Sequence, residues 1–460
     1  MKNIFYLTLT LFVFTINTFS QQNEDDINAL SIFSEYAKAK NYDAAYQPWM
    51  ELRNRNPRFN LNIFSQGEKI LKYKIKNSTG SEKIDFIQDL ILLYDQRREN
   101  FARKTPLGTF LAKSAKLRYD HRKILNISNA ELFESFDYAF KTDINTFNNP
   151  ADLLTYFKLS VKLFDEGTKS AEELFINYDE VSEKIESEVE NYTKKINQFL
   201  PADEATSLNL SKKDAQKIRS YNSYLKGYEQ VLKGMDISLG IRANCENLVL
   251  LYEKNYDENK NDVLWLQRAM NRLANKECLD TSIFVTILQQ KNNLDPNPDT
   301  SYYLGIIKDK EGNSQEALDY YNQAIDLETD GYKKAKVLFK IATKFKKAGS
   351  FSKARSYYRK ALSFNPSMGK CYIAIAQMYA SSAKNCGSDN FSQRAVYWLA
   401  SNEALKAAKV DGNLKKVANS TSQNYLSKAP QKSEIFSSGR EGELIKIECW
   451  IRASVNVPNL

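Results

Sequence analysis

A repeated spacing of small and aromatic residues between residues 298 and 366 constrains the fold more than any other feature. The first copy has these residues at Gly305, Gly312, Ala317, Tyr321 and Ala324. The second copy has the same residue types at Ala342, Gly349, Ala354, Tyr358 and Ala361, and it ends at Pro366. Small residues at these offsets let two helices approach closely, and glycine permits the left-handed backbone of the turn between them. The spacing predicts two tandem helix–turn–helix units.

This pattern is typical of the tetratricopeptide repeat, whose unit is about 34 residues long. Ala317 and Ala354 lie 37 residues apart, so the unit is lengthened by about one helical turn around 330–331. A third copy starts in register at Tyr372 and Tyr379 and is then interrupted by an insertion at 385–390. Such units bury their apolar faces only by stacking on one another. We therefore expect an all-α solenoid of antiparallel helix pairs.

The remaining chain divides by composition and helix signals. A degenerate repeat opens it, with Lys40 in place of the turn glycine. Ser128–Glu131 and Ser170–Glu173 are capping-box sequences that start helices. The expected regions are a signal peptide at 1–20, degenerate repeats at 21–126, a helical middle at 127–200, degenerate repeats at 201–297, repeats with an inserted loop at 298–429, and a tail at 430–460.

The tail differs from the rest of the chain in its residue pattern. Residues 443–457 partly alternate apolar and polar side chains and include β-branched residues, which favours a strand or a short β-hairpin. Such an element can cap the last helices or offer an edge to a partner, and we expect capping.

The first twenty residues have the features of a secretory signal peptide. Lys2 precedes an apolar run at 4–14, and Thr18 and Ser20 supply small residues before Gln21. We expect an exported protein, periplasmic or associated with the outer envelope. The alternative is an amino-terminal anchor that is never cleaved.

Export permits disulfide bonds among the five cysteines. Cys245 starts one expected helix and Cys278 follows the antiparallel helix after it, so we predict that these two pair. Cys371 and Cys386 flank a helix about 20 Å long and can pair only if the inserted loop folds back. Cys449 is then left without a partner.

Few residues in the chain point to catalysis or metal binding. The single histidine, His121, and the absence of a C-x-x-C motif argue against a zinc site. Residues 326–331 resemble half of a calcium loop, but Val337 stands where a bidentate Glu is needed. The formal charge of +9 is spread over a chain in which basic and acidic residues alternate, so we expect no nucleic-acid binding. We predict no catalytic residue, metal or cofactor.

The resemblance to tetratricopeptide repeats implies that the inner surface comes from the first helix of each pair. We predict partner contacts at Asp299, Tyr302, Asp309, Lys310, Lys336, Phe339, Lys346, Lys347, Lys370 and Gln377. Their mix of aromatic side chains and lysines suits an extended peptide with acidic groups. The alternative is that they pack on flanking helices or are merely solvated. The carboxylate clamp of chaperone-binding repeats is not matched, since Tyr302 and Ile306 replace its Lys and Asn.

Beyond the repeats, the chain resembles the exported tetratricopeptide-repeat proteins of Bacteroidota. The phrases that carry this resemblance are Ala45-Tyr46-Gln47-Pro48-Trp49, Asp309-Lys310-Glu311-Gly312 and Arg394-Ala395-Val396-Tyr397-Trp398-Leu399-Ala400. The tail sequence at 449–452 departs from the Gly-Trp-rich hairpin of that group. The resemblance implies a periplasmic or outer-envelope location in a Gram-negative bacterium and no defined activity.

Two functions follow as expectations. The first is a non-enzymatic scaffold of the cell envelope, which binds a partner protein or peptide through the inner surface of the repeats. The alternative is a small-ligand-binding protein or an enzyme with its site in the helical middle, 127–200.

Overall fold

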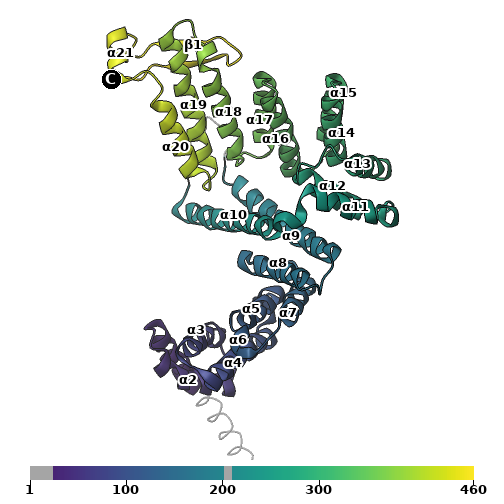
Figure 1. Ribbon diagram of the computed structural model, residues 1–460. Helices are drawn as coiled ribbons and strands as arrows, with labels where there is room; N and C mark the ends of the chain where they lie inside the picture. The colour runs from purple at the N-terminus through teal and green to yellow at the C-terminus, as the bar shows by residue number, and fades with distance from the viewer. Residues whose placement is uncertain (1–23, 201–209) are drawn as a thin grey trace, which may run out of the picture. The chain divides into compact units, whose positions relative to one another are not determined.

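The computed structural model describes residues 24–200 and 210–460. The expected signal peptide lies outside these residues, as does the start of the region expected at 201–297. The chain forms two compact units that meet at Lys184 and Ile185, within α9. In both units the described residues are predominantly helical (Figure 1).

The first unit begins with a helix at residues 24–38. Its further helices are α2 (Tyr42–Arg55), α3 (Asn62–Asn77), α4 (Gly80–Asn100), η1 (Ala102–Lys104), α5 (Leu107–Asp120), α6 (Arg122–Leu125), α7 (Asn129–Thr142), α8 (Pro150–Asp165) and the start of α9 (Ala171–Asn197).

The second unit holds the rest of α9 and all later elements. These are α10 (Lys212–Leu239), η2 (Gly240–Ala243), α11 (Cys245–Asn259), α12 (Val263–Asn275), α13 (Ser282–Leu294), α14 (Pro298–Lys310), α15 (Ser314–Leu327), α16 (Gly331–Lys347), α17 (Phe351–Phe364), α18 (Gly369–Ser382), η3 (Ala383–Asn385), α19 (Asn390–Val410), α20 (Lys415–Leu426), α21 (Lys432–Ser438), β1 (Leu444–Ile447) and β2 (Ala453–Asn456).

The predicted helix pairs are confirmed as α14–α15 and α16–α17, which lie side by side in Figure 1. A Cβ atom on Gly305 of α14 would stand 2.6 Å from the Tyr321 ring and 3.1 Å from the carbonyl oxygen of Ala317 on α15. Gly312 has a φ of +84° in the turn. The small residues therefore act as predicted, by letting the two helices touch.

The second pair repeats this arrangement, and the third begins with α18 and α19. Ala342 and Ala354 are fully buried where α16 meets α17, and the Tyr358 ring fills the space beside them. Gly349 has a φ of +73° in the turn. The chain is thus an α-solenoid of tetratricopeptide type in this region.

The degenerate repeat at the start uses a costlier turn. Lys40 takes the left-handed conformation, with a φ of +60°, where a side chain costs about 1 kcal/mol. The unit is held by Trp49, which is fully buried and donates from Nε1 to the carbonyl oxygen of Ile63 at 2.7 Å. Gly67 of α3 lies directly against the Trp49 ring, so this pair also depends on one small residue.

Local capping starts the middle helices where the sequence places them. The Ser128 hydroxyl and the Glu131 carboxylate form a reciprocal capping box at the start of α7. Ser170 and Glu173 make the corresponding two bonds before α9. Asp330, from the segment that resembles a calcium loop, caps α16 by accepting from the Lys333 amide.

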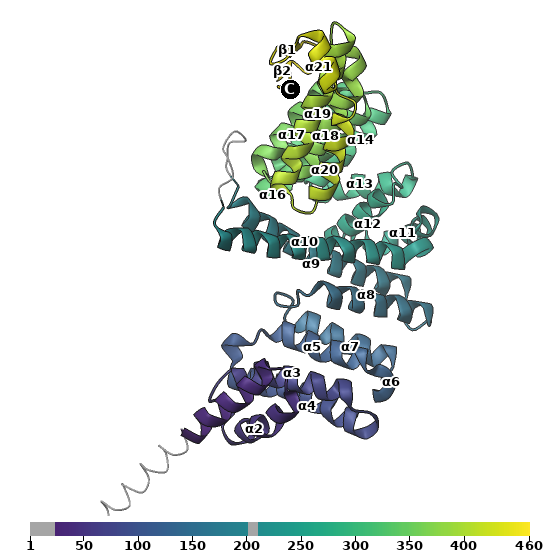
Figure 2. The same ribbon diagram turned by 90° about the vertical axis from the view of Figure 1, so that its left-hand side faces the viewer.

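The tail forms the predicted hairpin and packs on the end of the repeats (Figure 2). Strands β1 and β2 are antiparallel, with Ile445 opposite Val455. Arg355 of α17 donates to the carbonyl oxygens of Trp450 and Ile451. Trp450 in turn donates to Ser382 Oγ at 2.9 Å and packs on the rings of Phe351 and Tyr379. The hairpin therefore caps the last helices.

Two disulfides tie the second unit together. Cys245 and Cys278 are bonded, with their Cα atoms 5.6 Å apart, the pairing expected from the two adjacent helices. Cys449 bonds to Cys386, so the prediction that Cys449 is left over was wrong. The hairpin returns to the insertion after α18 and places Cys449 there. Cys371 instead points into the core as a buried thiol, and burial raises its pKa to about 12.

We expect Gly305→Ala to destabilise the protein by about 1–3 kcal/mol, since the added methyl group meets the Tyr321 ring and the α15 backbone. Denaturant or thermal unfolding measures this change. The matched control is Gly331→Ala, whose Cβ would lie at an ordinary contact distance of 3.7 Å from Phe364. This control should be neutral or stabilising by up to about 1 kcal/mol. Equal effects of the two variants would contradict the close-contact role of Gly305.

Candidate partner-binding surface

The ten residues predicted to contact a partner lie on the first helices of three successive pairs. Four are on α14, four on α16 and two on α18. We call this set the first-helix surface. Lys346 and Gln377 contact each other, while most of the other members contact residues outside the set.

The start of α14 is neutralised within the protein. The Asp299 carboxylate lies 3.4 Å from Nζ of Lys340 on α16 and accepts a hydrogen bond from Gln267 of α12. The Lys340 ammonium also lies 5.2 Å from the centre of the Tyr302 ring. Tyr302 is largely covered, and burial raises its pKa to about 12. These side chains bind one another and leave little charge for a partner.

The end of α14 is neutralised in the same way. Asp309 Oδ2 accepts from the Tyr321 hydroxyl at 2.8 Å and lies 3.8 Å from Nζ of Lys344. Lys310 forms an ion pair with Asp280, which precedes α13. All four α14 members of the first-helix surface are therefore engaged inside the second unit.

The first turns of α16 are also satisfied. Nζ of Lys336 lies 3.6 Å from the Glu186 carboxylate of α9. The Phe339 ring packs on the Tyr358 ring with a centroid separation of 5.4 Å. Phe339 is half-buried, so it acts in the core of the pair as well as at the surface.

The last turn of α16 is different. Lys346 donates to the Gln377 side chain of α18, and Lys347 is exposed. Among the described residues, no carboxylate lies within ion-pair distance of either ammonium. Burial without a compensating anion lowers the pKa of Lys346. Lys370, at the start of α18, is exposed as well. The last turn of α16 therefore keeps its positive charge, while the charge of Lys370 acts on the Asp411 carboxyl group.

The distribution of charge along the chain is a stronger signal than the net charge of the whole chain. Residues 331–388, which contain α16, α17 and α18, hold thirteen Lys and Arg residues and no Asp or Glu. The rest of the chain then holds 52 basic residues against 56 acidic ones, a net charge of −4. The excess positive charge of the protein lies on these three helices, and a count by segment would have located it.

The helical middle, which was the alternative site, contains a carboxyl group whose pKa is strongly raised. Asp152 of α8 is buried, and burial raises its pKa to about 6. Its main electrostatic neighbours are Lys116 and Asp120 of α5.

Metal-ligand clusters and membrane-spanning helices are both absent from the described residues, 24–200 and 210–460. No cluster of three or more metal-ligating side chains occurs there. No helix there combines the length and the apolar character that crossing a bilayer requires.

Comparison with known proteins finds curated relatives over a short stretch of the chain. The chain is 33% identical over 107 residues to the photosystem I assembly protein Ycf3 of Cyanophora paradoxa and to that of Cuscuta gronovii. These matches cover 21% of this chain and 62% and 64% of the two relatives, so the chain spans less than two thirds of either. No protein-family model matches the chain.

Matches to solved structures cover most of the chain but have low TM-scores. Yeast Tom70 is 12% identical and matches 91% of this chain and 99% of its own, with a TM-score of 0.27. A circular tandem repeat protein is 11% identical and matches 90% and 97%, with a TM-score of 0.20. Scores this low add nothing to the fold, which rests on the helix pairs described above.

We expect Lys346→Met to raise the free energy of unfolding by up to about 1 kcal/mol, because it removes a half-buried ammonium that has no carboxylate partner. Lys347→Met, which changes an exposed side chain by the same amount, should stay within about 0.5 kcal/mol of the parent protein. Chemical denaturation of the two variants measures the difference. A destabilised Lys346→Met would mean that the bond to Gln377 outweighs the cost of burial.

Proposed function

We propose that this protein is a non-enzymatic scaffold of the cell envelope that binds an acidic, extended segment of a partner protein. The contact is the α16–α18 end of the first-helix surface. The observation that carries this proposal is the uncompensated positive charge at Lys346 and Lys347, next to helices that hold no acidic residue.

The repeat architecture supports a protein as the partner. Stacked helix pairs present a long surface built from many side chains, which suits an extended chain more than a compact small molecule. The curated relatives are named as photosystem I assembly proteins. By analogy we assign a holding role to this chain.

The envelope location rests on two observations. In the first twenty residues, a positive charge, an apolar run and small residues follow one another as they do in a signal peptide. The second unit contains two disulfides, and disulfides persist in oxidising compartments such as the periplasm. Both support export across the inner membrane.

Cleavage of the signal peptide is directly measurable. We expect the protein purified from the envelope fraction of its host to begin at Gln21, because Thr18 and Ser20 provide the small residues that a signal peptidase requires. Intact mass with and without reduction gives the amino terminus and the number of disulfides together. A mature chain that still begins at Met1, or one found only in the cytoplasm, would contradict export.

The partner contact is tested by charge reversal on α16. We expect Lys346→Glu with Lys347→Glu to reduce capture of the native partner at least about tenfold, since two attractive charges become repulsive ones. Capture is measured by crosslinking in the host cell, followed by mass spectrometry of the linked peptides.

The matched control is Lys353→Glu with Lys360→Glu on α17. It makes the same change of net charge on the second helix of the same pair, away from the first-helix surface. Equal loss in both double variants would indicate diffuse attraction instead of a defined contact. Unchanged capture in the α16 variant, with its folding verified by circular dichroism, would remove this surface from the proposal.

A further inference from the structure

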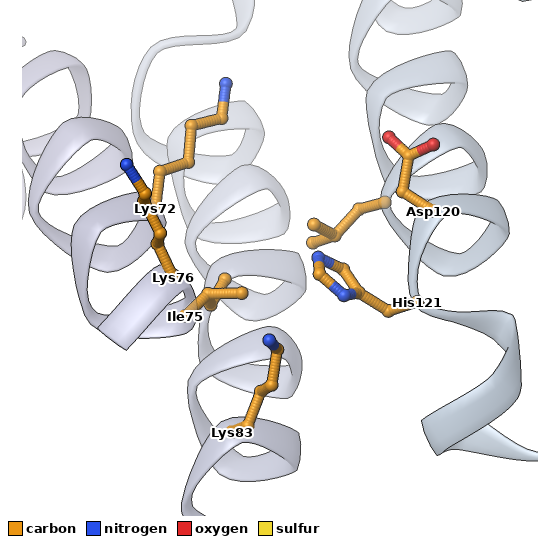
Figure 3. A pocket seen from close by; sticks show the side chains of 7 residues that line it. Lys72, Ile75, Lys76, Lys83, Asp120 and His121 are labelled. Atoms are coloured by element: carbon orange, nitrogen blue, oxygen red, sulfur yellow. The ribbon is translucent and has the colours of Figure 1, made fainter. Parts of the chain in front are cut away.

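A recess in the first unit lies outside everything assigned above. It has a volume of about 380 Å³, within the range of small-molecule sites. Its lining comes from α3, α4 and the end of α5 (Figure 3). The lining residues are Lys72, Ile75, Lys76, Lys83, Leu117, Asp120 and His121.

Three lysines and one carboxylate line this recess. Lys72 is paired with Glu68 at 2.7 Å, and Asp120 is paired with Lys116. Among the described residues, Lys76 and Lys83 have no carboxylate within ion-pair distance. The recess is therefore lined by two lysines without a carboxylate partner and by one carboxylate that already has a partner.

His121 responds to this environment. Figure 3 shows its ring directed from the end of α5 toward the side of Ile75 and Lys83. Burial lowers its pKa, and the charge of Lys83 lowers it further, as does the smaller effect of Lys116, while Asp120 acts in the opposite direction. Cations placed close together repel one another, and a bound anion would relieve that repulsion.

The apolar part of the recess is also defined. Ile75 is 3% exposed and Leu117 is 9% exposed, so both belong to the core of the unit, and they supply the apolar part of the lining. An apolar wall beside cationic side chains is complementary to a molecule that has both an apolar body and an anionic group.

We propose that this recess binds a small organic anion, a phosphate monoester or carboxylate with an apolar body. Lys76, Lys83 and His121 hold the anionic group, and Ile75 and Leu117 contact the apolar part. The site is separate from the first-helix surface and does not depend on the proposed scaffold function.

The single histidine makes the test direct, because its imidazole proton resonances in the full chain need no assignment. The protein, purified without a histidine tag, is titrated with phenyl phosphate, and the pKa of His121 is followed by proton NMR. Phenyl phosphate should bind saturably and raise this pKa, since a neighbouring anion stabilises the imidazolium. Benzyl alcohol, a neutral probe of similar size, should leave the pKa unchanged.

Variants identify the residues. Lys76→Gln and Lys83→Gln should each weaken phenyl phosphate binding at least about tenfold. Lys69→Gln, an exposed lysine on another part of α3, is the matched control and should bind as the parent does. Lys83→Gln should also raise the pKa of His121 without ligand, because it removes a neighbouring cation.

A second experiment, with lipid vesicles, distinguishes a lipid headgroup from a soluble ligand as the source of the phosphate group. Vesicles of phosphatidic acid in phosphatidylcholine test a lipid headgroup, while phenyl phosphate tests a soluble ligand. Binding in either arm that is lost in Lys83→Gln supports the site. The proposal is overturned if no saturable change occurs up to about 10 mM, if benzyl alcohol acts like phenyl phosphate, or if Lys69→Gln weakens binding as much as Lys83→Gln.

Discussion

The close approach of two helices at Gly305 and Tyr321 is the constraint on which the repeat region depends. A helix pair of this length buries too little apolar surface to be stable alone, so each pair must stack on the next. Stacking in turn requires that the two helices within a pair touch, and only a residue without a side chain fits against the Tyr321 ring. The same solution appears at Gly67 and Trp49 in the first unit, where the repeat is hard to recognise by sequence.

Once the helices are stacked, side chains on successive first helices meet, and their charges decide what the surface can bind. Asp299 and Asp309 of α14 form ion pairs with lysines of α16 and neutralise their charge. Helix α18, the next first helix, holds no carboxylate that could neutralise the lysines at the end of α16. Lys346 is therefore partly desolvated beside Gln377 without an anionic partner. Burying an ammonium without an anionic partner costs stability, which is why we propose a role in recognition for Lys346.

The hairpin shows how the last repeat is closed. A solenoid has an exposed apolar end that must be covered. Here Trp450 covers it through contacts with α17 and α18, and Arg355 holds the loop by its backbone carbonyls. The Cys386–Cys449 bond then fixes the cap to the insertion after α18. The insertion, which interrupts the repeat pattern in the sequence, thus provides the attachment point for the cap.

The sequence by itself determined the helix pairs, their turns, the caps at Ser128 and Ser170, and the terminal hairpin, because each depends on residues a few positions apart. It also indicated the pairing of Cys245 with Cys278, since neighbouring helices meet at predictable ends. Only the tertiary structure decided the partner of Cys449, the lysines that are neutralised by α14, and the recess around His121. These features depend on side chains that are far apart in the sequence and meet only after stacking, and local periodicity carries no information about such contacts.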